Sequence, residues 1–200
     1  MDILLVHGLG RTPVSLFMMA AALRREGHRT QFFGYSPTVE SLPRIVRRLT
    51  ARLETLAGEP VGLIGHSLGG LLLRMAISEV PTLRVRRLVM LGTPNRAPRL
   101  GRRAWTFFAF RWLTRDCGSL LAHPDQYAAI PIPRVPHTLI AGTAGPCGRW
   151  SPFGDDRNDG VVAVDEVPLG DGDEPLLFPV WHTLMMNDRR VQEAVVAALR

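Results

Sequence analysis

Short apolar runs alternate with helical stretches from the first residue to about residue 95. Strand-like runs occur at residues 2–6, 30–33, 60–64 and 85–91. The first is continuously apolar from Ile3 to Val6, as expected of a parallel strand that is buried on both faces. The stretches between the runs, at residues 13–25, 41–58 and 71–77, have helical character. This alternation predicts an α/β fold with a mostly parallel sheet and helices on both faces.

The alternation stops between residues 96 and 133. This segment has no strand pattern and combines aromatic residues with arginines, so we expect a helical insertion at the carboxyl edge of the sheet. Beyond it we expect a strand at residues 137–141, a short apolar segment at 161–164, a strand-like run at 175–180 and a terminal helix at 187–199. No internal repeat is present. We therefore predict a single domain over residues 1–200, with a cap at residues 96–133.

A G-x-S-x-G pattern, Gly65-His66-Ser67-Leu68-Gly69, connects the third strand to the third helix. A strand, a tight turn and a helix around such a pattern are typical of a nucleophile elbow, in which a strained backbone raises the serine hydroxyl above the sheet edge. The helix that follows favours negative charge at its beginning. The alternative is a glycine-rich turn without chemistry, but no Walker lysine follows the glycines. We therefore expect Ser67 to be a nucleophile.

A serine hydroxyl needs an adjacent base, and the base needs an orienting group. The expected base is His182, because it lies in a loop between the last strand-like run and the terminal helix, from which its ring can reach the sheet edge. The other histidines precede the serine, lie in distant loops or open a strand at its far end. The expected acid is Asp159, directly before the apolar segment, with Asp155 and Asp156 as alternatives in the same loop.

Two backbone amides should form the oxyanion hole, which stabilises the charge that develops on the substrate oxygen. One is the amide of Leu68, directly after the nucleophile. The other is the amide of Leu9, in the loop after the first strand, where Gly8 and Gly10 allow the backbone to turn inward. His7, before this loop, is expected to have a structural role.

Three aromatic residues of the cap, Trp105, Phe108 and Trp112, lie three and four residues apart, which predicts one shared helical face. They either pack on the core or bind substrate above Ser67, offering apolar surface to an acyl chain or to a lipid surface. In the second case the neighbouring arginines would lie at the level of the lipid headgroups.

The composition, with 46% apolar residues, is that of a globular protein. Its formal charge of +6 comes from arginine, because none of the 24 basic residues is a lysine. No basic helix interleaved with aromatic residues is present, so we do not expect nucleic-acid binding. A basic surface does favour anionic substrates or membrane surfaces.

The two cysteines, Cys117 and Cys147, form no C-x-x-C motif and lie near no pair of histidines, so we do not expect a metal site. The sequence does not decide whether these two cysteines form a disulfide. The chain opens on a strand rather than on a signal peptide, and it has no apolar stretch of about 20 residues that could span a membrane. We therefore expect a cytoplasmic protein.

These motifs together resemble those of the small bacterial lipases and esterases of the α/β-hydrolase family. The resemblance extends over nearly the whole chain and is carried by Val6–Gly10, Gly65–Gly70, Gly92–Asn95, Asn158–Val162 and the loop around His182. It implies a triad of Ser67, Asp159 and His182, oxyanion donors at Leu9 and Leu68, and a six-stranded sheet without the first two strands of larger members. Some relatives bind a structural calcium near the histidine loop, but the acidic residues here do not indicate one.

We therefore expect a serine hydrolase that cleaves carboxylic esters through an acyl-enzyme on Ser67, with a small-molecule ester or a lipid as substrate and no cofactor. Two alternatives stay open. The first is an acyltransferase or thioesterase that uses the same triad. The second is a non-catalytic module that binds a lipid or a protein partner.

Overall fold

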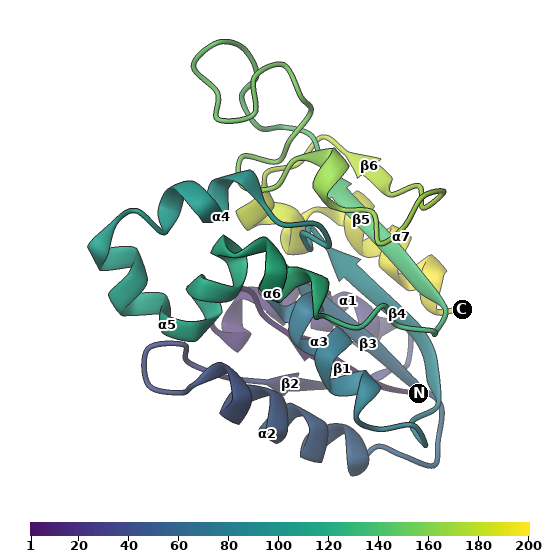
Figure 1. The fold of residues 1–200 in the computed structure, drawn as a ribbon. Coiled ribbons are helices and arrows are strands. Elements are labelled where there is room, and N and C mark those ends of the chain that lie inside the picture. Colours follow the sequence, from purple (N-terminus) through teal and green to yellow (C-terminus); the bar gives the residue numbers. More distant parts are fainter.

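A six-stranded parallel sheet forms the centre of the protein, and the computed structural model describes all of residues 1–200. The strand order is β2-β1-β3-β4-β5-β6 (Figure 1). The strands are β1 (Asp2–Val6), β2 (Arg29–Phe33), β3 (Val61–His66), β4 (Val85–Leu91), β5 (His137–Gly142) and β6 (Leu176–Phe178). The predicted α/β fold with about six strands is therefore confirmed.

Helices cover both faces of the sheet (Figure 1). One face carries α2 (Leu42–Glu54) and α3 (Leu68–Ser78), and the other carries α1 (Phe17–Arg25) and α7 (Arg189–Leu199). Successive side chains of a strand point to opposite faces. Accordingly, Leu4 packs in the cluster beneath α2 and α3, whereas Ile3 and Leu5 pack in the cluster beneath α1 and α7. Burial on both faces explains why this strand is apolar at every position.

The predicted helices differ from the observed ones at their ends. The first begins as a 3-10 turn, η1 (Pro13–Leu16), before α1. The helix predicted over residues 41–58 ends at Glu54, because the next amides bond to carbonyls only three residues back, as from Leu56 to Leu53 (3.0 Å). The apolar segment 161–164 adds no strand to the sheet and leads into a 3-10 turn, η2 (Val164–Glu166).

Three helices form the cap, and they lie over the carboxyl end of the sheet (Figure 1). They are α4 (Arg99–Ala104), α5 (Phe108–Ala122) and α6 (Pro124–Ala128). Helix α5 is kinked at Arg115, whose backbone angles (φ 44°, ψ −127°) lie outside the helical range. The kink is attached to the loop before α2, since the Thr38 hydroxyl donates to the Leu113 carbonyl oxygen (2.9 Å).

Both cysteines are free thiols, with Cys117 buried and Cys147 exposed, so the open question of a disulfide is answered in the negative. Burial raises the pKa of the Cys117 thiol to about 12. No helix combines the length and the apolar character needed to cross a membrane.

Candidate active site

Ser67 lies at the turn between β3 and α3 with φ 53° and ψ −124°, a conformation that is strained for any residue but glycine. The turn is held by the Ser67 amide, which donates to the Leu91 carbonyl oxygen (2.9 Å). A Cβ atom on Gly65 would lie 2.5 Å from the Gly70 Cα, and one on Gly69 would lie 2.3 Å from the Val6 carbonyl oxygen. The glycines of the motif are therefore needed because the first turn of α3 crosses close to β3 and β1.

His182 and Asp159 form a buried pair. The His182 Nδ1 donates to the Asp159 Oδ2 (2.7 Å), and the side chains are 7% and 1% exposed. The other carboxylate oxygen, Oδ1, accepts from the amides of Val161 (2.9 Å) and Val162 (2.7 Å). The His182 amide also donates to the Asp159 carbonyl oxygen (2.9 Å), so backbone and side chain hold the two residues in one arrangement. His182 begins the 3-10 helix η3 (His182–Asn187).

The alternative acids lie elsewhere. Asp155 and Asp156 are exposed, and the Asp156 Oδ2 accepts from the Arg99 guanidinium at 2.5 Å. Of the three carboxylates considered from the sequence, the structure therefore brings Asp159 to His182.

The end of β4 supports this pair, a role that the sequence analysis did not assign. Gly92 (φ 54°) lies so close that an added Cβ would be 3.0 Å from the His182 Nδ1 and 3.2 Å from the Asp159 Oδ2. Beside it, the Thr93 hydroxyl donates to the Ser67 carbonyl oxygen (3.1 Å). The sequence did contain a signal for this role, because Gly92 directly follows a predicted strand that ends at the same edge of the sheet as Ser67.

The two predicted oxyanion donors are free of hydrogen bonds within the protein. The Leu68 amide is at the first position of α3, where the helix itself provides no carbonyl acceptor. The Leu9 amide donates no hydrogen bond to another protein group. The loop that carries Leu9 passes directly beside the nucleophile, since an added Cβ on Gly8 would lie 3.0 Å from the Ser67 Cβ. Both amides are therefore available to a substrate oxygen near Ser67.

Two neutral histidines support the site. The His7 Nδ1 donates to the Gly8 carbonyl oxygen (2.9 Å), and its ring stacks on Tyr35 at 4.3 Å, which gives it the expected structural role. The His66 Nε2 donates to the His182 carbonyl oxygen (3.1 Å). Burial, followed by the nearby His182, holds the pKa of His66 well below its usual value, and burial also lowers the pKa of His7.

A cavity of about 210 Å³ opens above Ser67 and His182. The cap lines it with Leu100, Ala104, Phe110 and Leu121, and the loop after β1 lines it with Leu9 and Arg11. Trp105, Phe108 and Trp112 do not line this cavity; they border a separate hollow on the outer surface of the cap. The three aromatics do share one surface, but Phe110 is the aromatic cap residue that lines the Ser67 cavity.

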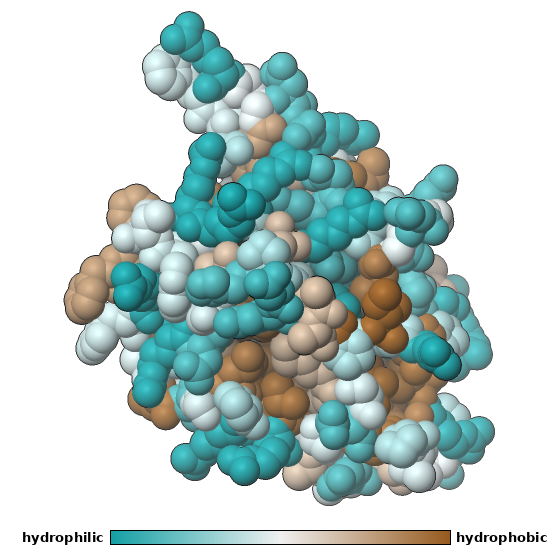
Figure 2. Space-filling view, in the orientation of Figure 1, coloured by the Kyte–Doolittle hydropathy of each residue, from teal (hydrophilic) through white to brown (hydrophobic).

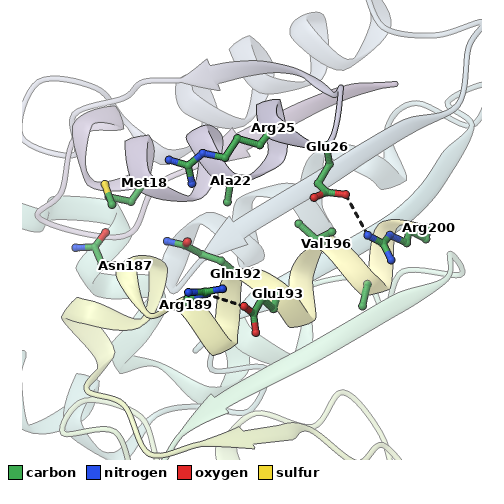
Figure 3. A pocket seen from close by; sticks show the side chains of 11 residues that line it. Met18, Ala22, Arg25, Glu26, Asn187, Arg189, Gln192, Glu193, Val196 and Arg200 are labelled. Carbon is green, nitrogen blue, oxygen red and sulfur yellow. Dashed lines mark hydrogen bonds and ion pairs between the residues drawn. The ribbon is translucent and has the colours of Figure 1, made fainter.

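A larger hollow of about 730 Å³ lies between α1 and α7 (Figure 3). Four of its charged side chains form two ion pairs, Arg189 with Glu193 (2.8 Å) and Arg200 with Glu26 (3.0 Å). No residue that lines it also lines the Ser67 cavity. No group of three or more potential metal ligands occurs anywhere in the structure, so we assign no residue to a metal.

Solved structures with the same fold include lipases and thioesterases. The alignment with the mature lipase BlEst2 of Bacillus licheniformis covers 99% of this chain and 91% of the lipase chain, with 20% identity and a TM-score of 0.71. The alignment with a structure from the metagenome-derived lipolytic enzymes LipS and LipT covers 100% of this chain and 93% of the other, with 15% identity and a TM-score of 0.71. The alignment with the RedJ thioesterase of the prodiginine pathway in Streptomyces coelicolor covers 100% of this chain and 89% of the thioesterase chain, with 17% identity and a TM-score of 0.61.

At these identities the similarity establishes the fold. No curated protein sequence matches the chain. A family model described as the alpha/beta hydrolase family matches residues 3–200, and the chain therefore belongs to that family.

Proposed function

We propose that this protein is a serine hydrolase that cleaves carboxylic esters with Ser67, His182 and Asp159. The observation that carries the proposal is the buried contact between the His182 Nδ1 and the Asp159 Oδ2 (2.7 Å), because His182 lines the same cavity as the strained Ser67. A carboxylate in this position holds the imidazole in one tautomer, which leaves Nε2 free to accept a proton.

In the proposed reaction the Ser67 Oγ attacks the ester carbonyl carbon while the His182 Nε2 takes the hydroxyl proton. The negative charge that forms on the carbonyl oxygen is stabilised by the amides of Leu9 and Leu68. The alcohol then leaves with the proton from His182, and the acyl group stays on Ser67. A water molecule attacks this acyl-enzyme, gives its proton to His182, and releases the acid as the proton returns to Ser67.

The Ser67 hydroxyl makes no hydrogen bond in this conformation, although it borders the same cavity as His182. Contacts between a nucleophile and its base are often long in the absence of substrate and shorten when substrate binds. We therefore expect the Ser67–His182 hydrogen bond to form in the complex with substrate.

Labelling with a fluorophosphonate and hydrolysis of p-nitrophenyl esters test the proposal together. The wild-type protein should be labelled at Ser67 and should hydrolyse short esters, whereas Ser67→Ala should lose turnover about a thousandfold or more. Ser78→Ala, at an exposed serine of α3, serves as the matched control and should keep full activity. Folded wild-type protein that is neither labelled nor active would support the non-catalytic alternative instead.

A thioesterase is the second candidate, because the structural neighbours include thioesterases as well as lipases. Rates on matched oxygen esters and thioesters of one acyl group separate the two activities. Adding a competing alcohol tests for acyl transfer, because a transferase yields a new ester in place of the free acid.

We also propose that the outer face of the cap contacts an anionic lipid surface. Phe108 (78% exposed) and Trp112 (64%) lie there among arginines, and Figure 2 shows apolar side chains at the outer edge of the cap. Phosphatidylglycerol vesicles should bind the protein more strongly than phosphatidylcholine vesicles, and Phe108→Asp should weaken this binding. Phe17→Asp, at an exposed phenylalanine of α1, is the control. Equal binding to both kinds of vesicle would contradict the proposal.

A further inference from the structure

Arg11 is the only arginine that lines the Ser67 cavity. The other lining residues are apolar or uncharged, apart from the neutral His66 and the catalytic candidate His182, and none is a carboxylate. Arg11 lies two residues after Leu9, and its own amide donates to the Gly8 carbonyl oxygen (3.2 Å), which fixes the turn that also positions the Leu9 amide. The cation is therefore part of the same loop as the proposed oxyanion donor.

The Arg11 side chain has no hydrogen-bond or ion-pair partner in the protein, although it is half-buried. Every other arginine without a hydrogen-bond or ion-pair partner is exposed to solvent, as Arg25 is. The more deeply buried Arg74 satisfies its guanidinium with three acceptors. Arg11 thus differs from the rest: it is partly removed from water and unpaired, beside a proposed nucleophile.

A guanidinium stays charged at any physiological pH, and partial burial of a charge without a partner is unfavourable. Its planar fork of donors suits the oxygens of a carboxylate or a phosphate. The charge of Arg11 also contributes to the low pKa of the neighbouring His66, so the guanidinium acts on the interior of the site. An anionic group on a bound substrate would supply the missing partner.

We propose that Arg11 selects substrates that carry a carboxylate or phosphate group close to the ester or thioester bond. The apolar part of such a substrate would contact Leu100, Ala104, Phe110 and Leu121 of the cap. The inference rests on the proposed hydrolase function and narrows its substrate class. Arg11 is assigned a role in specificity, because proton transfer and oxyanion stabilisation use other groups.

Two matched pairs of compounds test this proposal. Mono-p-nitrophenyl succinate carries a carboxylate on the acyl side and is compared with neutral p-nitrophenyl butyrate. Butyryl-coenzyme A carries phosphates on the thiol side and is compared with neutral S-butyryl-N-acetylcysteamine. Arg11→Gln should lower kcat/KM by about 10- to 100-fold for the anionic member of at least one pair, and leave the neutral members within about twofold. The pair that responds identifies which side of the substrate carries the anion.

Arg11→Lys should give an intermediate loss, because a lysine keeps the charge but not the fork. Arg25→Gln, at an exposed arginine that lines the hollow between α1 and α7 and not the Ser67 cavity, should change none of the four rates. Equal losses on the neutral and anionic members, or no loss on either, would overturn the proposal.

Binding to Ser67→Ala, measured by titration calorimetry, separates this inference from the proposed function. The anionic member should bind more tightly than the neutral one, and adding Arg11→Gln should remove that preference. If the wild type hydrolyses none of the four compounds but the preference is found, the hydrolase proposal fails and the anion site stands. If Ser67→Ala shows no preference in either pair, the anion site is wrong whatever the turnover.

Discussion

At the scale of single residues, the strain at Ser67 should be measurable as lost stability. Its φ of 53° suits glycine, so Ser67→Gly should unfold with a free energy about 1 kcal/mol higher than that of Ser67→Ala. Urea denaturation measures the difference. Ala51→Gly, at an exposed position within α2, should instead lower the free energy by about 1 kcal/mol. If glycine at position 67 is no more stable than alanine, the elbow is not strained.

Asp159 should matter for turnover through its contact with His182. Asp159→Asn keeps the shape of the side chain but favours the wrong imidazole tautomer, so kcat should fall by about 10⁴-fold. Asp156→Asn removes an exposed carboxylate that pairs with Arg99 and should leave kcat unchanged. Steady-state kinetics on one soluble ester compares the two variants. If Asp156→Asn causes the larger loss, the acid of the triad has been assigned incorrectly.

At the scale of elements, Arg74 joins α3 to the last residues of the cap. Its guanidinium donates to the carbonyl oxygens of Ile130 (3.1 Å) and Pro131 (3.1 Å) and to the Asn95 Oδ1 (3.0 Å). Burial lowers its pKa to about 10, which still leaves it charged at neutral pH. The end of the cap is therefore held by a buried cation bonded to backbone oxygens.

Arg74→Met should lower the free energy of unfolding by about 2–4 kcal/mol, because two buried acceptors and one part-buried acceptor lose their donor. Arg74→Lys should fall between this variant and the wild type, since an ammonium cannot reproduce the fork. Arg84→Met, at an exposed arginine, is the control and should stay within about 0.5 kcal/mol. Chemical denaturation measures the free energy of unfolding of each variant. If Arg74→Met is as stable as the wild type, these contacts do not anchor the cap.

Some of these elements could be predicted from the sequence and others could not. Strand runs and the G-x-S-x-G turn are local patterns, so the sheet and the position of Ser67 followed from the sequence. The helical character of the cap followed too, but its internal arrangement did not, because helical spacing assumed one helix where the structure has a turn at residues 105–107 and a kink at Arg115. Phe110, rather than Phe108, consequently lines the cavity. Contacts such as that of Arg74 with Pro131 join distant positions, and no local pattern records them.

At the scale of the whole molecule, two buried histidines link stability to pH. His7 and His66 are each 1% exposed, and burial is the largest cause of the lowered pKa of both. In the unfolded chain each would titrate near its ordinary pKa of about 6.5. Below that pH the unfolded state therefore binds protons that the folded state does not, and the free energy of unfolding must fall as the pH is lowered.

Each histidine should contribute a slope of up to about 1.4 kcal/mol per pH unit between about pH 6.5 and its own lowered pKa. Above pH 6.5 both states are neutral at these positions, so the contribution to stability is complete there. His66→Gln can keep the hydrogen bond to the His182 carbonyl oxygen and should make the slope between pH 6.5 and 5 shallower. Urea denaturation at several pH values measures the slope, and His7→Asn should reduce it independently. A slope that neither substitution changes would mean that groups other than His7 and His66 control the acid sensitivity.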